Sequence, residues 1–199
     1  MNDFLLKLYV VLCISFFTHQ ARAGVLLEPF VGYGQTTVST TDLSATDAQS
    51  KDSGLGYGSR LGYRFNQSFW IAAEYAAGSG TSKSSTPGIA DMNYNNTAMS
   101  AVVGYDHNHF RVWAGYGFSD KVTLKDSSGT ETNFSGTNYK LGVGLRPSTS
   151  FSVNFEYLIP KYTKYNTAGG ADADVSTIYS KMDVSSMFLS VSFPFDLGK

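Results

Sequence analysis

The chain of 199 residues has the length of a single domain, and only 16% of its residues are charged. Its formal net charge of −1 provides no basic footprint for nucleic acid, so binding of DNA or RNA is excluded as a main activity. The single cysteine, Cys13, excludes a small secreted domain held together by disulfides.

The first 23 residues have the pattern of a secretory signal peptide. An apolar run covers residues 8–17, and Ala21-Arg22-Ala23 forms the A-x-A pattern that precedes a cleavage site. The run is shorter than the roughly 20 apolar residues that a membrane-spanning helix needs. We therefore predict cleavage before Gly24, which leaves residues 24–199 as one exported domain without cysteine.

Eight stretches of the remaining sequence alternate, residue by residue, between apolar side chains and glycine or polar side chains. In residues 54–65, for example, Leu55, Tyr57 and Leu61 share one face, whereas Arg60 and Arg64 lie on the other. A period of two indicates β-strands, because successive side chains leave a strand on opposite sides. The predicted strands cover residues 25–35, 54–65, 69–76, 97–105, 110–119, 137–146, 151–159 and 187–195.

The connections between these stretches have two lengths. Short turns at residues 66–68, 106–109 and 147–150 alternate with long polar loops at residues 36–53, 78–96, 120–136 and 163–182. Short turns at one end and long loops at the other are typical of bacterial outer-membrane barrels. We therefore predict an all-β fold, an eight-stranded antiparallel up-and-down transmembrane β-barrel, with both termini on the periplasmic, short-turn side.

Aromatic residues support this membrane assignment. Phe65, Phe69 and Phe151 flank the short turns, whereas Tyr33 and Tyr116 lie toward the long loops. Two bands of aromatic rings are expected at the two headgroup regions of a bilayer.

Charged residues occupy the face opposite the apolar one and therefore point into the predicted barrel. Neighbouring strands carry opposite signs, which allows pairing across the ladder. Because an isolated buried charge is very costly, we expect a connected network and a plugged interior, with a narrow ion path as the alternative. The predicted network comprises Glu28, Arg60, Arg64, Glu74, Arg111, Lys140, Arg146 and Glu156.

The alternating strands, the asymmetry of the connections and the inward Arg/Glu set resemble the small outer-membrane barrels of the OmpA transmembrane-domain and OmpX/Ail type. The resemblance implies location in the bacterial outer membrane, assembly by the outer-membrane insertion machinery, and a structural or surface-interaction role, such as adhesion, through the long loops. In contrast to many members of that group, this chain does not end on an aromatic residue, because Asp196-Leu197-Gly198-Lys199 follows Phe195.

Other functions receive weaker support from the sequence. Enzymes in small barrels resemble His/Ser/acid catalysts near the outer leaflet, but His107 and His109 fall in a predicted periplasmic turn. We expect no catalytic site, cofactor or metal, although His107-Asn108-His109 and Asp172-Ala173-Asp174 are weak metal candidates. A small pore, a transporter of hydrophobic solutes and a soluble lipocalin-like ligand-binding barrel remain alternatives.

Cations near the end of the seventh predicted strand indicate contact with the outer leaflet. Positive side chains next to aromatic rings attract anionic headgroups, or they extend along the apolar surface toward water. We predict outer-membrane lipids and lipopolysaccharide as partners, together with an unknown surface ligand of the loops. The candidate lipopolysaccharide contacts are Lys161, Tyr162, Lys164 and Tyr165.

Overall fold

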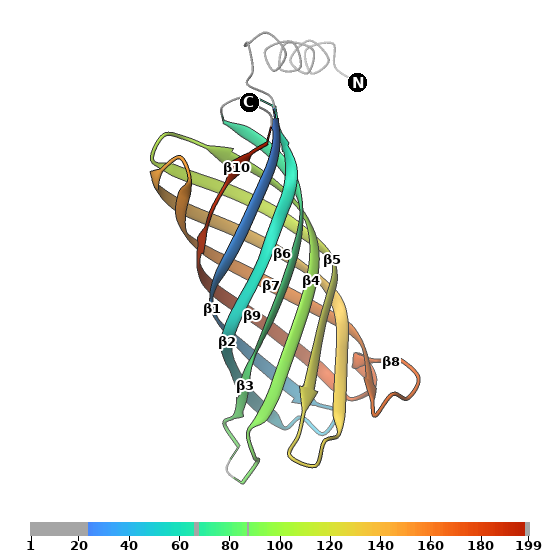
Figure 1. The fold of residues 1–199 in the computed structure, drawn as a ribbon. Helices are drawn as coiled ribbons and strands as arrows, with labels where there is room; N and C mark the ends of the chain where they lie inside the picture. Colours follow the sequence, from blue (N-terminus) through green and yellow to red (C-terminus); the bar gives the residue numbers. More distant parts are fainter. Residues whose placement is uncertain (1–23, 66–67, 87, 198–199) are drawn as a thin grey trace, which may run out of the picture.

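The computed structural model describes residues 24–65, 68–86 and 88–197, so the predicted signal peptide lies outside the described residues. Eight long strands dominate this part of the chain, and they wind around a common axis (Figure 1). They are β1 (Gly24–Asp42), β2 (Asp47–Arg64), β3 (Phe69–Ser84), β4 (Met92–Asp106), β5 (Phe110–Lys125), β6 (Glu131–Ser148), β7 (Phe151–Thr167) and β9 (Tyr179–Ser192). Three short elements complete the description, namely β8 (Ala173–Asp174), the 3₁₀ turn η1 (Val175–Thr177) and β10 (Phe195–Asp196).

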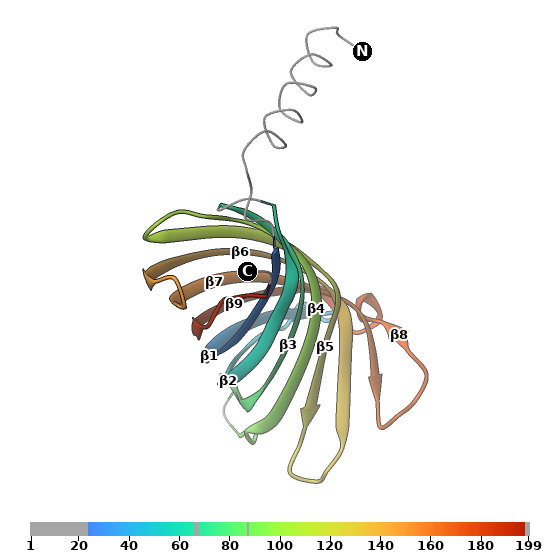
Figure 2. The same cartoon turned by 45° about the horizontal axis from the view of Figure 1, so that its top comes forward.

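The long strands form a closed antiparallel ring. Each pairs with the strand that follows it, and β9 pairs with both β7 and β1, for example through Val191 opposite Val31. Figure 2 shows the strands curving around the axis. The eight-stranded up-and-down barrel predicted from the sequence is therefore confirmed. Within the described residues, no helix is long and apolar enough to cross a membrane.

The two faces of the barrel wall have reversed polarity compared with a soluble protein. On β2, Leu61 is 57% exposed, whereas its neighbour Arg60 is completely buried. Apolar side chains thus point outward and charged side chains point inward, as in a barrel surrounded by lipid. This orientation contradicts the lipocalin-like alternative, in which the apolar face would surround a ligand.

Aromatic side chains gather in two outward-facing bands, one near each end of this apolar wall. Tyr116 and Tyr139 on neighbouring strands lie 5.3 Å apart between ring centroids, toward the long connections. At the other end Phe69 contacts Tyr105 at 4.9 Å, beside a short turn. Such bands suit the two interfaces of a bilayer.

The predicted long loops are mostly β-structure. Pairing of β1 with β2 continues to Thr41 opposite Asp47, and pairing of β5 with β6 continues to Lys125 opposite Glu131. The outer faces of these segments are largely polar, as expected for strands beyond the apolar band, and apolar residues such as Val122 and Leu124 point inward instead, so the outward apolar alternation stops here. We call the end with the four paired extensions the hairpin end, and the opposite end, where β1 begins and β10 lies, the short-turn end (Figure 1).

The proline of β1 lies opposite the break in the last strand region of the chain. Pro29 is inside β1, which is unusual because proline cannot donate a ladder hydrogen bond. Its carbonyl accepts from the Phe193 backbone N–H at 3.0 Å, where Phe193-Pro194 separates β9 from β10. Pro29, which has no backbone N–H to donate, therefore lies where the partner strand is interrupted. The predicted last strand, residues 187–195, is divided at this point into the end of β9 and β10.

Glycines on the inner face make room for the two tryptophans. Trp113 lies over Gly142, where an added Cβ would be 2.0 Å from a ring carbon, and Trp70 lies over Gly104 in the same way. Both rings are almost completely buried. Large side chains can therefore cross the lumen of a barrel whose interior is only wide enough for side chains.

Candidate functional site

The central feature of the interior is Arg60, which contacts three carboxylates. Its guanidinium donates to Glu74 and Glu156 at 2.7 Å each and to Glu28 at 3.2 Å. Glu28 and Glu74 lie directly opposite Arg60 on the neighbouring strands β1 and β3, whereas Glu156 reaches it across the lumen from β7. All of these side chains are buried.

Two further cations extend this cluster across the barrel. Arg111 donates to the second oxygen of Glu28 at 2.9 Å, and Lys140 contacts Glu74 and lies 4.0 Å from Glu156. Three cations and three carboxylates thus balance one another. We call this set the charged layer, and it comprises Glu28, Arg60, Glu74, Arg111, Lys140 and Glu156.

Aromatic rings fill the space between the charges. The Arg60 guanidinium carbon lies 5.1 Å from the Phe30 ring centroid and 4.7 Å from that of Trp113. Arg111 lies 5.2 Å from the Trp70 ring and 5.4 Å from the Trp113 ring. These separations allow cation–π attraction. Ion pairs and rings together therefore occupy the lumen at this depth.

Asp106, which the sequence analysis placed in a short turn, organises a second cluster nearer the short-turn end. It accepts from the Trp70 indole at 2.8 Å, from Arg64 at 3.0 Å and from Arg146 at 3.1 Å, so these two predicted network arginines belong to this cluster. Asp106 is the last residue of β4 and keeps the inward parity of Gly104. That continued alternation was the signal that could have identified it.

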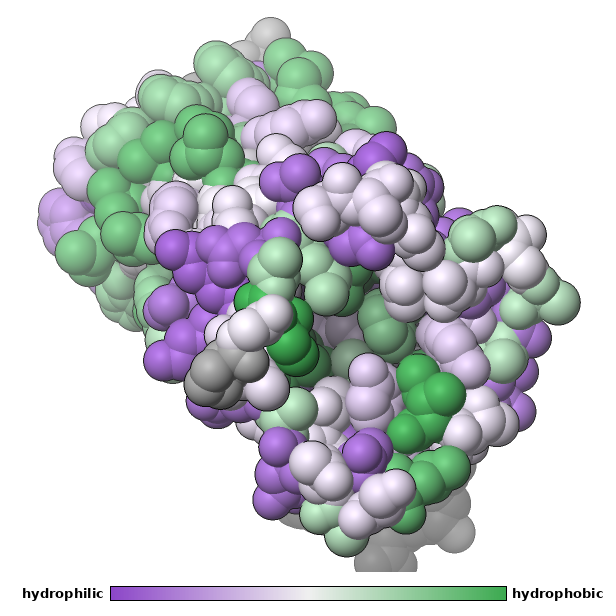
Figure 3. All heavy atoms as spheres, turned by 90° about the horizontal axis from the view of Figure 1, so that it is seen from below, coloured by the Kyte–Doolittle hydropathy of each residue, from purple (hydrophilic) through white to green (hydrophobic). Residues whose placement is uncertain are grey.

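Above the charged layer, toward the hairpin end, the barrel contains a cavity of about 290 Å³. It is visible from that end as a hollow among the hairpins (Figure 3). The charged layer forms its floor through Glu74, Lys140 and Glu156. Apolar side chains contribute much of the wall, including Val122, Leu124, Phe134, Leu158 and Val184.

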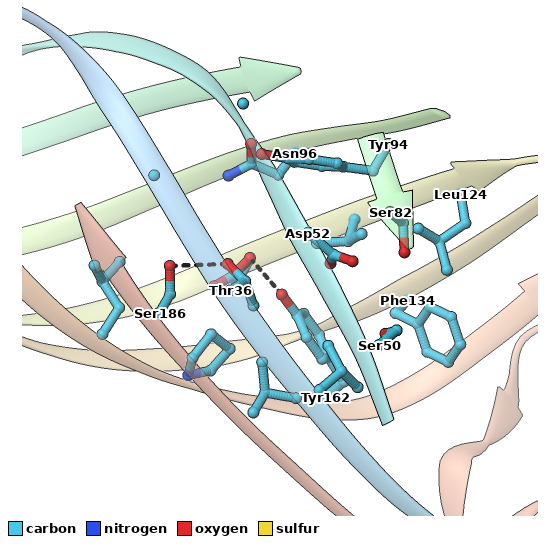
Figure 4. Close-up of a pocket in the computed structure, with 18 of the residues that line it drawn as sticks. Thr36, Ser50, Asp52, Ser82, Tyr94, Asn96, Leu124, Phe134, Tyr162 and Ser186 are labelled. Atoms are coloured by element: carbon cyan, nitrogen blue, oxygen red, sulfur yellow. Dashed lines mark hydrogen bonds between the residues drawn. The ribbon is translucent and has the colours of Figure 1, made fainter. Parts of the chain in front are cut away.

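Polar groups from several strands face this cavity (Figure 4). On one side, Asp120 accepts from the Asn138 amide at 2.8 Å and from the Tyr162 hydroxyl at 3.4 Å. On the other, Asp52 is 7% exposed and its Oδ1 has no hydrogen-bond partner among the described residues. Burial raises the pKa of both carboxyl groups, and hydrogen bonds from Ser82 and Asn138, respectively, oppose that change.

Asp120 points inward because of a β-bulge in β5 that cannot be recognised from the sequence. The ladder shifts between Gly117 and Asp120, where β5 carries one residue more than β6. Without this bulge, parity would place Asp120 on the outer face. A β-bulge re-aims the side chains that follow it, and here it brings the carboxylate into the cavity.

The four candidate lipopolysaccharide contacts do not share one surface. Tyr162 faces the cavity, which corrects its assignment to the outer leaflet: β7 continues to Thr167, and Tyr162 keeps the inward parity of Glu156. Tyr165 is half-buried and its ring lies 6.4 Å from that of Phe134. A bulge at Thr163 leaves Lys164 exposed, where Asp174 holds it at 2.7 Å.

Lys161 is the candidate that lies on the outer wall beside the aromatic band, with its ammonium 5.8 Å from the Tyr139 ring centroid. A second cation, Lys121 on β5, lies in a segment whose sequence predicts a loop. It is also exposed and lies opposite Ser135 of β6, close to the position where Lys161 of β7 faces Thr137.

The weak metal candidates do not converge. The described residues contain no group of three or more His, Cys, Asp or Glu side chains placed to hold a metal ion. His107 stacks on Phe110 at 4.9 Å, and Asp172 accepts from Asn166 at 2.7 Å.

Comparison with known proteins identifies the family of this chain. The model of the outer membrane protein beta-barrel domain family matches residues 4–193. The chain belongs to this family. No curated protein matches the sequence.

Solved structures of small outer-membrane barrels share the fold at low sequence identity. Ail, the attachment invasion locus protein of Yersinia pestis, solved in complex with the heparin analogue sucrose octasulfate, has a TM-score of 0.57 and 14% identity over 86% of this chain and 99% of that chain. OprG from Pseudomonas aeruginosa has a TM-score of 0.50 and 14% identity, covering 88% and 98% of the two chains. Neisserial surface protein A has a TM-score of 0.50 and 11% identity, covering 84% and 97%.

The charged layer yields a stability prediction for this outer-membrane barrel. Replacing Arg60 by Met should destabilise the protein by about 3–5 kcal/mol, because three buried carboxylates lose their shared cation. The matched control Lys83→Met breaks an exposed pair with Asp91 and should change stability little. Urea unfolding in lipid vesicles, followed by gel mobility of the folded barrel, measures both. Equal stability of Arg60→Met and the native protein would contradict a tightly coupled layer.

Asp52→Asn should stabilise the protein at neutral pH, because it removes a buried charge without a salt-bridge partner. Burial raises the Asp52 pKa above its ordinary 3.8, so the folded state keeps this proton to higher pH than the unfolded chain. The penalty is therefore absent below the ordinary pKa and complete above the raised one. Unfolding midpoints should coincide near about pH 3 and diverge as pH rises. A variant less stable than the native protein at neutral pH would contradict the prediction.

Proposed function

We propose that the protein is a closed, non-conducting barrel of the bacterial outer membrane that acts through its hairpin end in surface contact of the adhesion type. The observation that carries the proposal is the charged layer, in which Arg60 alone joins Glu28, Glu74 and Glu156 across the lumen. A lumen occupied at mid-depth by paired charges and indole rings opposes passive flow. The projecting hairpins then offer the surface through which the protein can act.

The hairpin end faces the outside in this proposal, and both termini face the periplasm. Short turns on the periplasmic side and longer connections outside are the usual arrangement in this class of barrel. The outer-membrane insertion machinery would place the barrel in this orientation after removal of residues 1–23.

The chemistry of the hairpins favours a mixed polar partner over a polyanion. Ail is described in complex with a heparin analogue, which is densely anionic. In this chain, however, exposed lysines of the hairpins lie next to carboxylates: Lys125 is 3.2 Å from Glu131, and Lys181 is 2.7 Å from Asp183. Positive charge that is locally neutralised attracts an anionic polymer weakly.

Enzymatic catalysis is not part of the proposal. A histidine base must lie within hydrogen-bond reach of its nucleophile. His107 and His109 lie in the turn between β4 and β5 at the short-turn end, far along the barrel from the cavity and the hairpins.

Two measurements test this proposal together. Purified protein in planar lipid bilayers should give no stable channels, and cells that display it should adhere to an extracellular-matrix-coated surface. Shortening the β1–β2 and β5–β6 hairpins at paired positions should abolish adhesion while the barrel still folds. Substitution of Thr149 and Ser150 in the two-residue β6–β7 turn, without a change of length, provides the control. Stable conductance would make the protein a small pore, and adhesion that survives shortening would contradict a role for the hairpins.

We further propose that Lys121 and Lys161 contact lipopolysaccharide phosphates on the outer wall. Each lysine near an anionic membrane surface contributes about 1 kcal/mol, and salt screens that attraction. Lipopolysaccharide should therefore raise the melting temperature of the native protein in low salt. The double variant Lys121→Gln/Lys161→Gln should lose most of this increase, whereas Lys83→Gln on the β3–β4 hairpin should retain it. An unchanged increase in the double variant would overturn this contact.

A further inference from the structure

Asp52 is a buried carboxylate that forms no salt bridge with any residue in the described part of the chain. It is 7% exposed, it lines the cavity, and its Oδ1 accepts no hydrogen bond from the described residues. None of the salt bridges among these residues includes Asp52 or Asp120. An unpaired buried charge is costly, and its position at the wall of a cavity points to a bound group that supplies the missing partner.

The cavity has an excess of negative charge. Lys140 is the cation in its described lining, and it is already shared by Glu74 and Glu156 in the floor. Because the charged layer is balanced, Asp52 and Asp120 add their charge to the cavity without compensation. An anionic ligand would be repelled, and a neutral ligand could donate a hydrogen bond to Asp52 but would leave its charge without a counter-charge.

Aromatic and apolar side chains surround the carboxylates. Tyr94 and Tyr162 line the same cavity. Burial raises the pKa of both phenols, and the charge of Asp52, with that of Asp120 for Tyr162, adds to the rise. Figure 4 shows Phe134 and Leu124 in the same wall. Aromatic faces attract an organic cation, and the apolar wall accepts a hydrocarbon body.

We propose that this cavity binds a small amphipathic ammonium compound, with the cationic head at Asp52 and the apolar body against Tyr94, Tyr162, Phe134 and Leu124. The volume of about 290 Å³ suits a ligand at the small end of the usual range for binding sites. A divalent cation fits less well, because the described residues supply no cluster of three metal-ligating side chains.

Access to the site is from the hairpin end. Val38, Ile89, Met182 and Val184 line the cavity between the hairpins, and the hollow there is open in Figure 3. The charged layer closes the opposite side. The cavity is thus a cup that takes up a ligand from one side of the membrane, which goes beyond surface contact through the outer faces of the hairpins.

The experiment compares two probes of the same shape and different charge. Isothermal titration calorimetry of the full barrel in a non-ionic maltoside detergent would use 2-phenylethylammonium and the neutral 2-phenylethanol. The native protein should bind the ammonium at least tenfold more tightly than the alcohol. Asp52→Asn should weaken ammonium binding at least tenfold and leave the alcohol unaffected. The control Asp183→Asn, an exposed acid of the same end, should behave like the native protein.

A steric variant provides an independent test. Ser50 lies two residues before Asp52 and lines the same cavity, so Ser50→Phe should reduce binding of both probes without removing charge. Gel mobility confirms that each variant is folded. Equal affinity for the two probes, an unaffected Asp52→Asn variant, or no binding to folded native protein would each overturn the proposal. These outcomes are separate from the adhesion assay, which depends on hairpin length.

Discussion

Arg60 is held by three carboxylates from three strands, and the arrangement of the interior depends on this contact. Glu28 and Glu74 come from the neighbouring strands, whereas Glu156 comes from β7 across the lumen. In a medium of low dielectric constant, no member can be removed without leaving an unbalanced charge. The ion cluster therefore fixes the relative depth of β1, β2, β3 and β7, in addition to the register that their backbone hydrogen bonds impose. It also divides the lumen into a filled half and an open half.

The open half results from a change in side-chain size along the inner face. Near the charged layer, Trp70, Trp113 and the arginines cross the lumen. Toward the hairpin end, β1 to β3 present Gly34, Gly56 and Ala76 to the interior, and these cannot reach the opposite wall. Space remains where small residues face medium-sized apolar ones. A lumen that is packed at one level and hollow at another suits binding better than conduction.

Sequence alternation could predict the fold and much of the charged layer, because parity alone decides which residues point inward. Arg60 opposite Glu74 follows directly from the hairpin register, but the contact of Arg60 with Glu156 depends on barrel closure, which parity does not encode. Asp106 was missed because a strand end and a turn look alike in sequence. Asp120 could not be placed because a bulge reverses its direction. The hairpin extensions were not recognised as strands because their outer faces are polar and their apolar residues, such as Val122 and Phe134, point inward. The cavity follows from these last features, so it was not predictable.

The paired hairpin extensions limit how the length of this protein can change. In a β-ladder, an insertion or deletion of one residue turns every following side chain to the opposite face. In these extensions such a change would turn Asp52 or Tyr162 out of the cavity. It would also shift the backbone N–H and C=O groups away from their hydrogen-bond partners on the neighbouring strand. Tolerated length variation should therefore be restricted to the tips at residues 43–46, 85–86, 88–91, 126–130, 168–172 and 175–178, which lie outside the paired strands. Surface diversity among relatives with this architecture would then arise at the four hairpin tips and by substitution on the outer faces. The side chains that line the cavity would keep their inward orientation.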